Sequence, residues 1–276
     1  MLRLLPGLLA AVGAAVLLLS AVLLGVHGHH APPGMRPAAA GQTLWQDTGA
    51  QAVRRVAPAV ARVSVLAASA LPSVSGRPVA VRVVGSGFVV DPRGGVLTSA
   101  SLVAGARSVD VQVGGHGPVL PVDTMSLDAA DDIALLHVQP PNRLPALRLA
   151  AVGQPLAGTY VLALGHASAG FGVVSGDARR LLLPDGSLHH LLQTDAPINL
   201  GNVGGPLINL SGQVIGMATL QVPGGRGIGF AVPAEDIQAA IGRFRLSAPR
   251  TGGAWKPVAA SIWRHIPPPL KWSVRA

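Results

Sequence analysis

The most informative segment of the chain is Gln193-Thr-Asp-Ala-Pro-Ile-Asn-Leu-Gly-Asn-Val-Gly-Gly-Pro-Leu207. Its centre is rich in Gly, Asn and Pro, which favour tight turns over regular helices or strands. Strand-like runs border it, with Leu191–Thr194 before the turn residues and Pro206–Asn209 after them. The segment therefore predicts a tightly folded loop between two short strands.

Short runs rich in β-branched residues recur on both sides of this loop, bounded by Gly, Pro or Asp. The linker Gln139-Pro-Pro-Asn142 separates them into two groups. Ala234–Phe244 follows with apolar residues at helical spacing and with Glu235 and Asp236 in its first turn, where the helix dipole favours acids. Two groups of strands and a closing helix predict an all-β domain of two packed β-barrels over residues 52–245. The first group is Val53–Val65 (a helical or extended entry and then a strand), Val81–Val90, Gly95–Thr98, Ser108–Val113, Pro118–Val122 and Ile133–Val138; the second is Val161–Leu164, Gly172–Ser175, Leu191–Thr194, Pro206–Asn209, Gln213–Leu220 and Gly227–Val232.

The composition agrees with a β-rich fold and excludes several kinds of site. Hydrophobic residues make up 49% and charged residues 12% of the 276 residues, with 35 Gly and 24 Pro, which is unlike a charged helical bundle. The absence of Cys excludes disulfides and thiolate chemistry. The net charge of +9 is scattered without a long basic run or interleaved aromatic residues. Surface charge is therefore favoured over a nucleic-acid site.

The amino-terminal residues predict a location outside the cytoplasm. Leu4–Val26 carries no charge and follows Arg3, so residues 1–26 are predicted to be a transmembrane helix, with a cleaved signal segment as the alternative. Residues 27–51 lack periodicity and are predicted to be a flexible linker. This linker contains a group of histidines that could bind a metal ion, although no ligand-spaced partner follows and chance is favoured: His27, His29 and His30. No metal or other cofactor is therefore predicted.

The last segment, residues 246–276, is a basic tail rich in Trp and Pro. It holds Trp255, Trp263 and Trp272. These residues could pack on the barrels, lie at a membrane interface or contact a partner. Packing on the barrels is slightly favoured.

The segment 193–207 resembles the nucleophile loop of HtrA/Deg-type serine proteases, which have the trypsin-like, chymotrypsin fold. The family has Gln-Thr-Asp-Ala-Ala/Pro-Ile-Asn-Pro/Arg-Gly-Asn-Ser-Gly-Gly-Pro-Leu at this place. Further matches follow in the family's order: Gly85-Ser-Gly-Phe-Val-Val-Asp91, Leu97-Thr-Ser-Ala-Ser-Leu-Val103, Asp131-Asp-Ile-Ala-Leu-Leu136, Asn209–Met217 and Gly227–Pro233. The resemblance implies two six-stranded antiparallel barrels with a carboxy-terminal helix.

The resemblance also assigns the three catalytic positions. The acid position holds Asp132, but the His position holds Ser101 and the nucleophile position holds Val203. Triad chemistry needs a hydroxyl nucleophile, an imidazole base and a carboxylate that orients the base. Val203 has no hydroxyl, and an alcohol such as Ser101 is not a base at neutral pH. The oxyanion-hole residues Gly201, Asn202 and Val203 keep their glycine-rich framework, so their backbone donors are expected to be intact.

These residues predict a catalytically degenerate family member, a membrane-anchored pseudoprotease of the cell envelope with a role in protein quality control. Its expected partners are peptides, unfolded proteins or an active paralogue, and trimers are expected by analogy. About 30 residues follow Phe244, too few for the PDZ domain that HtrA/Deg proteins often carry. The alternative is a serine endopeptidase with residual or unconventional activity.

Overall fold

The computed structural model describes residues 39–72, 78–151, 153, 155–182, 188–221 and 227–247. Both predicted barrels lie in one compact unit, Trp45–Ala276. The predicted amino-terminal helix (1–26), His27, His29, His30 and almost all of the predicted tail lie outside the described residues. Among the residues that are described, no helix has both the length and the apolar character needed to cross a bilayer.

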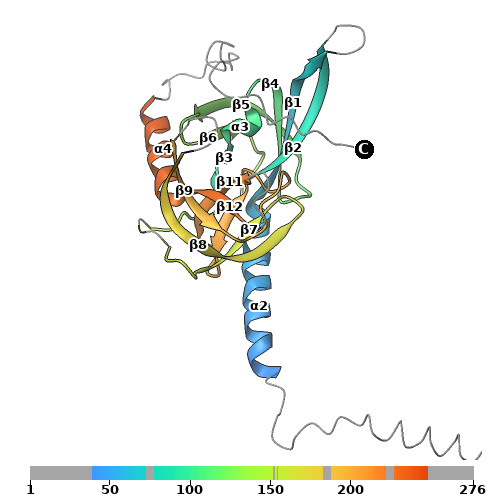
Figure 1. Ribbon diagram of the computed structural model, residues 1–276. Helices are drawn as coiled ribbons and strands as arrows, with labels where there is room; N and C mark the ends of the chain where they lie inside the picture. Colours follow the sequence, from blue (N-terminus) through green and yellow to red (C-terminus); the bar gives the residue numbers. More distant parts are fainter. Residues whose placement is uncertain are drawn as a thin grey trace, which may run out of the picture. The chain divides into compact units, whose positions relative to one another are not determined.

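The first barrel is a closed sheet of six antiparallel strands in the order β1-β2-β3-β6-β5-β4 (Figure 1). It closes because β1 pairs with both β2 and β4. In β4, buried Val109, Val111 and Val113 alternate with more exposed residues, as expected for a strand with one face in the core. The strands are β1 (Val60–Pro72), β2 (Pro78–Asp91), β3 (Gly95–Ser99), β4 (Ala106–Val113), β5 (Val119–Asp128) and β6 (Ile133–Val138), with the short helix α3 (Ala100–Val103) after β3.

The second barrel is also closed, in the order β10-β11-β12-β9-β8-β7. Its strands are β7 (Tyr160–Leu164), β8 (Ala169–Leu182), β9 (Leu188–Thr194), β10 (Pro206–Asn209), β11 (Val214–Gln221) and β12 (Gly229–Pro233), followed by α4 (Ala234–Ser247). The predicted pair of six-stranded antiparallel barrels and the closing helix are therefore confirmed.

Three hydrophobic clusters hold the barrels together. One lies within the first barrel and includes Val63 and Leu136, and another lies within the second and includes Leu192 and Leu207. The third joins the two barrels, because it contains side chains from both of them and from α4. This shared cluster packs strands of the two barrels and α4 against one another.

The prediction of a flexible linker over 27–51 is wrong for its described part. Residues 39–51 form most of the helix α2 (Ala39–Val56), which runs into the 3-10 turn η1 (Ala57–Ala59). Ala and Gln favour helix here, and Arg54 and Arg55 in the last turn interact well with the helix dipole. Ala52 and Val56, one helical turn apart, are buried in the shared cluster. Their packing stabilises the helix, although apolar residues recur only weakly at helical spacing in the rest of it.

Candidate functional site

Asp132 lies in the turn between β5 and β6, next to the first residue of β6. Its φ is +53°, which makes it the one non-glycine residue with positive φ in the described part of the chain. Aspartate tolerates this left-handed conformation better than most residues. The turn directs the Asp132 carbonyl to the N–H of Ala100 (3.1 Å), and so ties the turn to the start of α3.

The Asp132 carboxylate accepts three hydrogen bonds. One oxygen accepts the Ser101 backbone N–H (2.7 Å), and the other accepts the Ser99 hydroxyl (2.6 Å). The Thr219 hydroxyl, from β11 of the second barrel, also donates to this second oxygen. Asp132 is partly buried, and a carboxylate removed from water without partners would be costly, so these donors stabilise it in this position.

Ser101 takes part in this group through both its backbone and its hydroxyl. The hydroxyl oxygens of Ser99 and Ser101 are 2.7 Å apart. A serine hydroxyl has a single proton, and that of Ser99 is given to Asp132, so the Ser101 hydroxyl must donate to Ser99. The two hydroxyls and the carboxylate thus form a chain with no basic nitrogen in it.

Val203 lies in the loop between β9 and β10, where contacts to both barrels fix its backbone. Its carbonyl accepts the N–H of Ser86 in β2 (3.0 Å), and the N–H of Gly204 donates to Ala218 in β11 (2.7 Å). Gly204 has φ +81°, and a Cβ there would lie 3.0 Å from the Ser99 nitrogen and 2.3 Å from Thr98 Oγ1. Only glycine fits this approach, which places Val203 beside the residues that hold Asp132. The half-buried Val203 side chain packs against the second-barrel cluster.

The backbone donors expected for an oxyanion hole are all used inside this loop. The Gly201 N–H donates to the side-chain oxygen of Asn199 (2.9 Å). The N–H groups of Asn202 and Val203 donate to the Asn199 carbonyl (3.0 and 3.1 Å). These three N–H groups therefore donate to Asn199 within the loop.

Ser86 and His166 anchor the loop from outside and were not predicted from the sequence. The buried Ser86 hydroxyl donates to the Gly201 carbonyl (2.7 Å) and accepts the His166 backbone N–H (2.8 Å). His166 Nδ1 lies 3.2 Å from the same oxygen. Burial, with the charge of Arg62 second, lowers the pKa of His166, so the imidazole is neutral at pH 7. The only sequence signal for this contact was a polar Ser86 between two glycines in a strand.

The chain was compared with known protein families and proteins. The family described as trypsin-like peptidase domain matches residues 85–217. Serine protease HTRA2, mitochondrial, of Bos taurus is 34% identical over 225 residues, which are 79% of this chain and 46% of that protein. The chain belongs to the HtrA/Deg-type family of trypsin-like serine proteases. Serine protease HTRA1A of Danio rerio is 36% identical over 197 residues (68% of this chain, 40% of that protein), and serine protease HTRA3 of Homo sapiens is 34% identical over 210 residues (71% and 45%).

This HtrA/Deg-type chain spans less than half the length of these relatives. The residues matched to the peptidase domain, 85–217, include Ser101, Asp132 and Val203 as well as the loop that holds Asn199. The relatives are named serine proteases.

Proposed function

We propose that this HtrA/Deg-type chain is a pseudoprotease that binds protein or peptide partners without cutting them. The observation that carries the proposal is the set of side chains at the catalytic positions, Ser101, Asp132 and Val203. The side chain of valine has no acidic proton and no lone pair with which to attack a carbonyl. The nucleophile is therefore missing at its position.

The base is missing as well, and the expected loss of turnover is large. In serine proteases, removal of the nucleophile or of the base lowers turnover by about 10⁶-fold, and the activity that remains over water comes from the oxyanion hole and from binding. The N–H groups of Gly201 and Val203 donate to Asn199 in this loop, so that remaining contribution is reduced too. Loss of one oxyanion donor costs about 10²–10³-fold in related chemistry.

Support for a binding role comes from apolar surface at the same loop. Leu200 is 66% exposed and lies three residues before Val203. A single exposed leucine is ordinary, but with half-buried Val203 nearby it offers apolar contacts where a protease would have polar catalytic groups. Extended peptides and unfolded proteins expose such apolar side chains, so they are the partner class that we propose.

The proposal extends to location and assembly. We propose that residues 4–26 anchor the chain in a membrane of the cell envelope, with the barrels outside the cytoplasm, because this stretch is apolar and follows Arg3. An active paralogue, joined in a mixed trimer, is the protein partner that we propose besides unfolded chains. We propose no nucleic-acid partner.

The test of the missing chemistry uses the purified full chain and a fluorophosphonate probe, with HTRA2 as the active comparison. We expect no labelling and no cleavage of casein over a day. Val203→Ala is the matched control and should be equally inert, since neither side chain can be acylated. Stoichiometric labelling of the wild-type chain would instead support the alternative, a serine endopeptidase of unconventional mechanism.

The binding role has its own test. We expect the full chain to bind unfolded casein, as measured by a fluorescence-anisotropy titration, and Leu200→Asp to weaken that binding by at least about 10-fold, since it puts a charge into an apolar contact. Leu156→Asp, at a position 75% exposed on another loop, is the control and should bind as the wild type does. Equal binding by Leu200→Asp would exclude this loop as the contact surface.

A further inference from the structure

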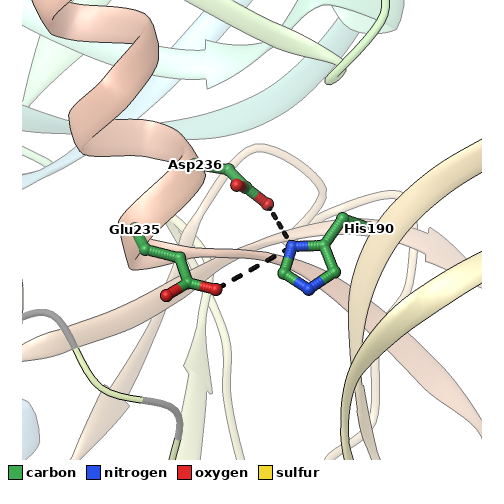
Figure 2. A group of neighbouring side chains, drawn as sticks. All are labelled: His190, Glu235 and Asp236. Atoms are coloured by element: carbon green, nitrogen blue, oxygen red, sulfur yellow. Dashed lines mark hydrogen bonds and ion pairs between the residues drawn. The ribbon is translucent and has the colours of Figure 1, made fainter.

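Three metal-ligating side chains meet away from the catalytic positions, at the junction of β9 and α4. His190 comes from β9, and Glu235 and Asp236 come from the first turn of α4 (Figure 2). His190 Nδ1 lies 2.7 Å from Asp236 Oδ2 and 3.9 Å from Glu235 Oε1. All three donor atoms lie within 4.8 Å of one another.

We propose that His190, Glu235 and Asp236 form a binding site for a divalent transition-metal ion, and that Zn²⁺ is the ion that fits best. One imidazole nitrogen and two carboxylate oxygens are donors that Zn²⁺ accepts, whereas Mg²⁺ and Ca²⁺ prefer oxygen donors alone. A water molecule would complete four-coordination on the solvent side, since each of the three side chains is between 26% and 28% exposed.

The distances fit this ion with little movement. Zn–N and Zn–O bonds of about 2.0–2.2 Å place neighbouring tetrahedral ligands roughly 3.3–3.5 Å apart. The observed separations from His190 Nδ1, 2.7 and 3.9 Å, lie on either side of that value. Small side-chain rotations would therefore suffice, on a backbone that buried Ala234 and Ile237 hold at the start of α4.

The hydrogen bond between His190 and Asp236 joins two of the three donor side chains. The Nδ1 atom carries at most one proton, and its hydrogen bond goes to Asp236. Glu235 Oε1, at 3.9 Å, is beyond hydrogen-bonding distance of Nδ1 but still faces it (Figure 2). A metal ion would replace that proton and use all three donors, and it would balance the two carboxylate charges at the helix N-terminus.

The bound ion would join two parts of the fold that are far apart in sequence. β9 leads directly into the loop that carries Asn199 and Val203, and α4 packs in the cluster shared by both barrels. The ion would therefore act as a structural cross-link that stabilises the native state in proportion to its binding.

The experiment measures zinc binding to the full chain by isothermal titration calorimetry with ZnCl₂. Every protein sample carries His27→Gln, His29→Gln and His30→Gln, so that the amino-terminal histidines do not contribute. We expect this reference chain to bind one equivalent of Zn²⁺ and to melt at a higher temperature with Zn²⁺, but not with Mg²⁺ or Ca²⁺.

Substitutions assign the site. His190→Gln should abolish the binding of that equivalent. Glu235→Gln removes a charged direct ligand and should weaken binding by at least the roughly 10-fold that loss of an outer-shell contact commonly costs. His116→Gln, an exposed histidine of the first barrel, is the matched control and should change nothing. Circular dichroism checks the folding of each variant.

The proposal is overturned if the reference chain binds no Zn²⁺ at 100-µM concentrations, or if His190→Gln folds and still binds it with unchanged affinity. If His190→Gln does not fold, Glu235→Gln and Asp236→Asn decide: weaker binding in both supports the site, and unchanged binding in both overturns it. Equal loss of binding in His116→Gln would place the ion elsewhere and would also overturn the proposal.

Discussion

At the scale of single residues, hydrogen bonds from protein donors hold the Asp132 carboxylate in place. Ser99, Thr219 and the Ser101 N–H satisfy the carboxylate from three directions. These donors come from both barrels, so the carboxylate also links the barrels. The presence of Asp132 therefore needs no catalytic explanation, because its replacement would leave the buried Ser99 hydroxyl without this acceptor.

Restoring the missing groups tests the assignment of the catalytic positions. Ser101→His together with Val203→Ser should gain fluorophosphonate labelling, because Asp132 can orient the new imidazole. The rate of labelling should stay at least about 10²-fold below that of HTRA2, because the N–H groups of Gly201 and Val203 already donate hydrogen bonds to Asn199. Neither single variant should be labelled, since each lacks half of the nucleophile–base pair. Labelling of Val203→Ser alone would mean that the base is another residue.

The Ser86 hydroxyl should contribute measurably to stability. Ser86→Ala leaves the partly buried Gly201 carbonyl and His166 N–H without this partner, and a fully buried unsatisfied group costs about 1–3 kcal/mol. Because water can reach both groups in part, we expect urea denaturation to show a total loss of about 1–3 kcal/mol. Ser108→Ala, an exposed serine of β4, is the control and should lie within about 0.5 kcal/mol of wild type. A Ser86→Ala variant as stable as the wild type would contradict this role.

At the scale of elements, the turn between β2 and β3 is held by a charge pair that responds to pH. The Arg93 side chain donates to both carboxylate oxygens of Asp91 (2.7 Å for the shortest contact) and lowers the pKa of that carboxyl to about 2. Because the pKa in the folded state is below the usual 3.8, the pair stabilises the fold above about pH 3.8, and this stabilisation is lost as the pH falls toward 2.

Melting temperatures test the sign of this effect. Arg93→Gln should melt below the wild type at pH 7, and the difference should shrink as the pH falls from about 3.8 toward 2, where protonation of Asp91 weakens the pair in the wild type. Arg107→Gln, at an exposed position of β4, should show no such pH-dependent difference. A difference between wild type and Arg93→Gln that persists unchanged at pH 2 would contradict the assignment to Asp91.

Elements with strong local patterns could be predicted from the sequence. Ile133–Val138 and Pro206–Asn209 have the predicted bounds, because β-branched and apolar runs end there at clear turn residues. β8 extends well beyond the predicted Gly172–Ser175, since its outer part is a ribbon paired to β9 and needs no apolar alternation. The helix α2 could not be predicted, because it depends on tertiary burial of Ala52 and Val56.

Some features of the candidate site could also be predicted from the sequence, and others could not. The assignment of Asp132, Ser101 and Val203 to catalytic positions comes from sequence motifs and stays a prediction, and the structure brings Ser101 and Asp132 into hydrogen-bonding contact. The direction of the Gly201 and Val203 N–H groups could not be predicted, because backbone orientation in a glycine-rich loop is set by Asn199, a residue with no catalytic position. Thr219 was missed because its contact with Asp132 joins residues that are 87 apart in sequence.

At the scale of the whole molecule, α4 and the two barrels share one core. Ile237 and Phe244 of α4 belong to the same cluster as Ile133 of the first barrel and Leu164 of the second. Arg243 on the same helix pairs with Asp128, at the end of β5, and with Asp131, in the turn that follows it in the first barrel. The helix follows the second barrel in sequence and contacts both barrels. Loss of its packing should therefore destabilise both of them.

This shared core predicts that the barrels unfold together. Ile237→Ala removes a fully buried side chain from the cluster and should cost about 2–5 kcal/mol. Because that cluster has side chains from both barrels, native-state hydrogen exchange should show equal loss of protection in the most protected amides of β1 and β7, with a single calorimetric transition. Leu246→Ala, at a 90% exposed position of the same helix, is the matched control and should leave both barrels as protected as in the wild type. Loss of protection confined to the second barrel would mean that the barrels are independent folding units, and that α4 stabilises only the barrel from which it emerges.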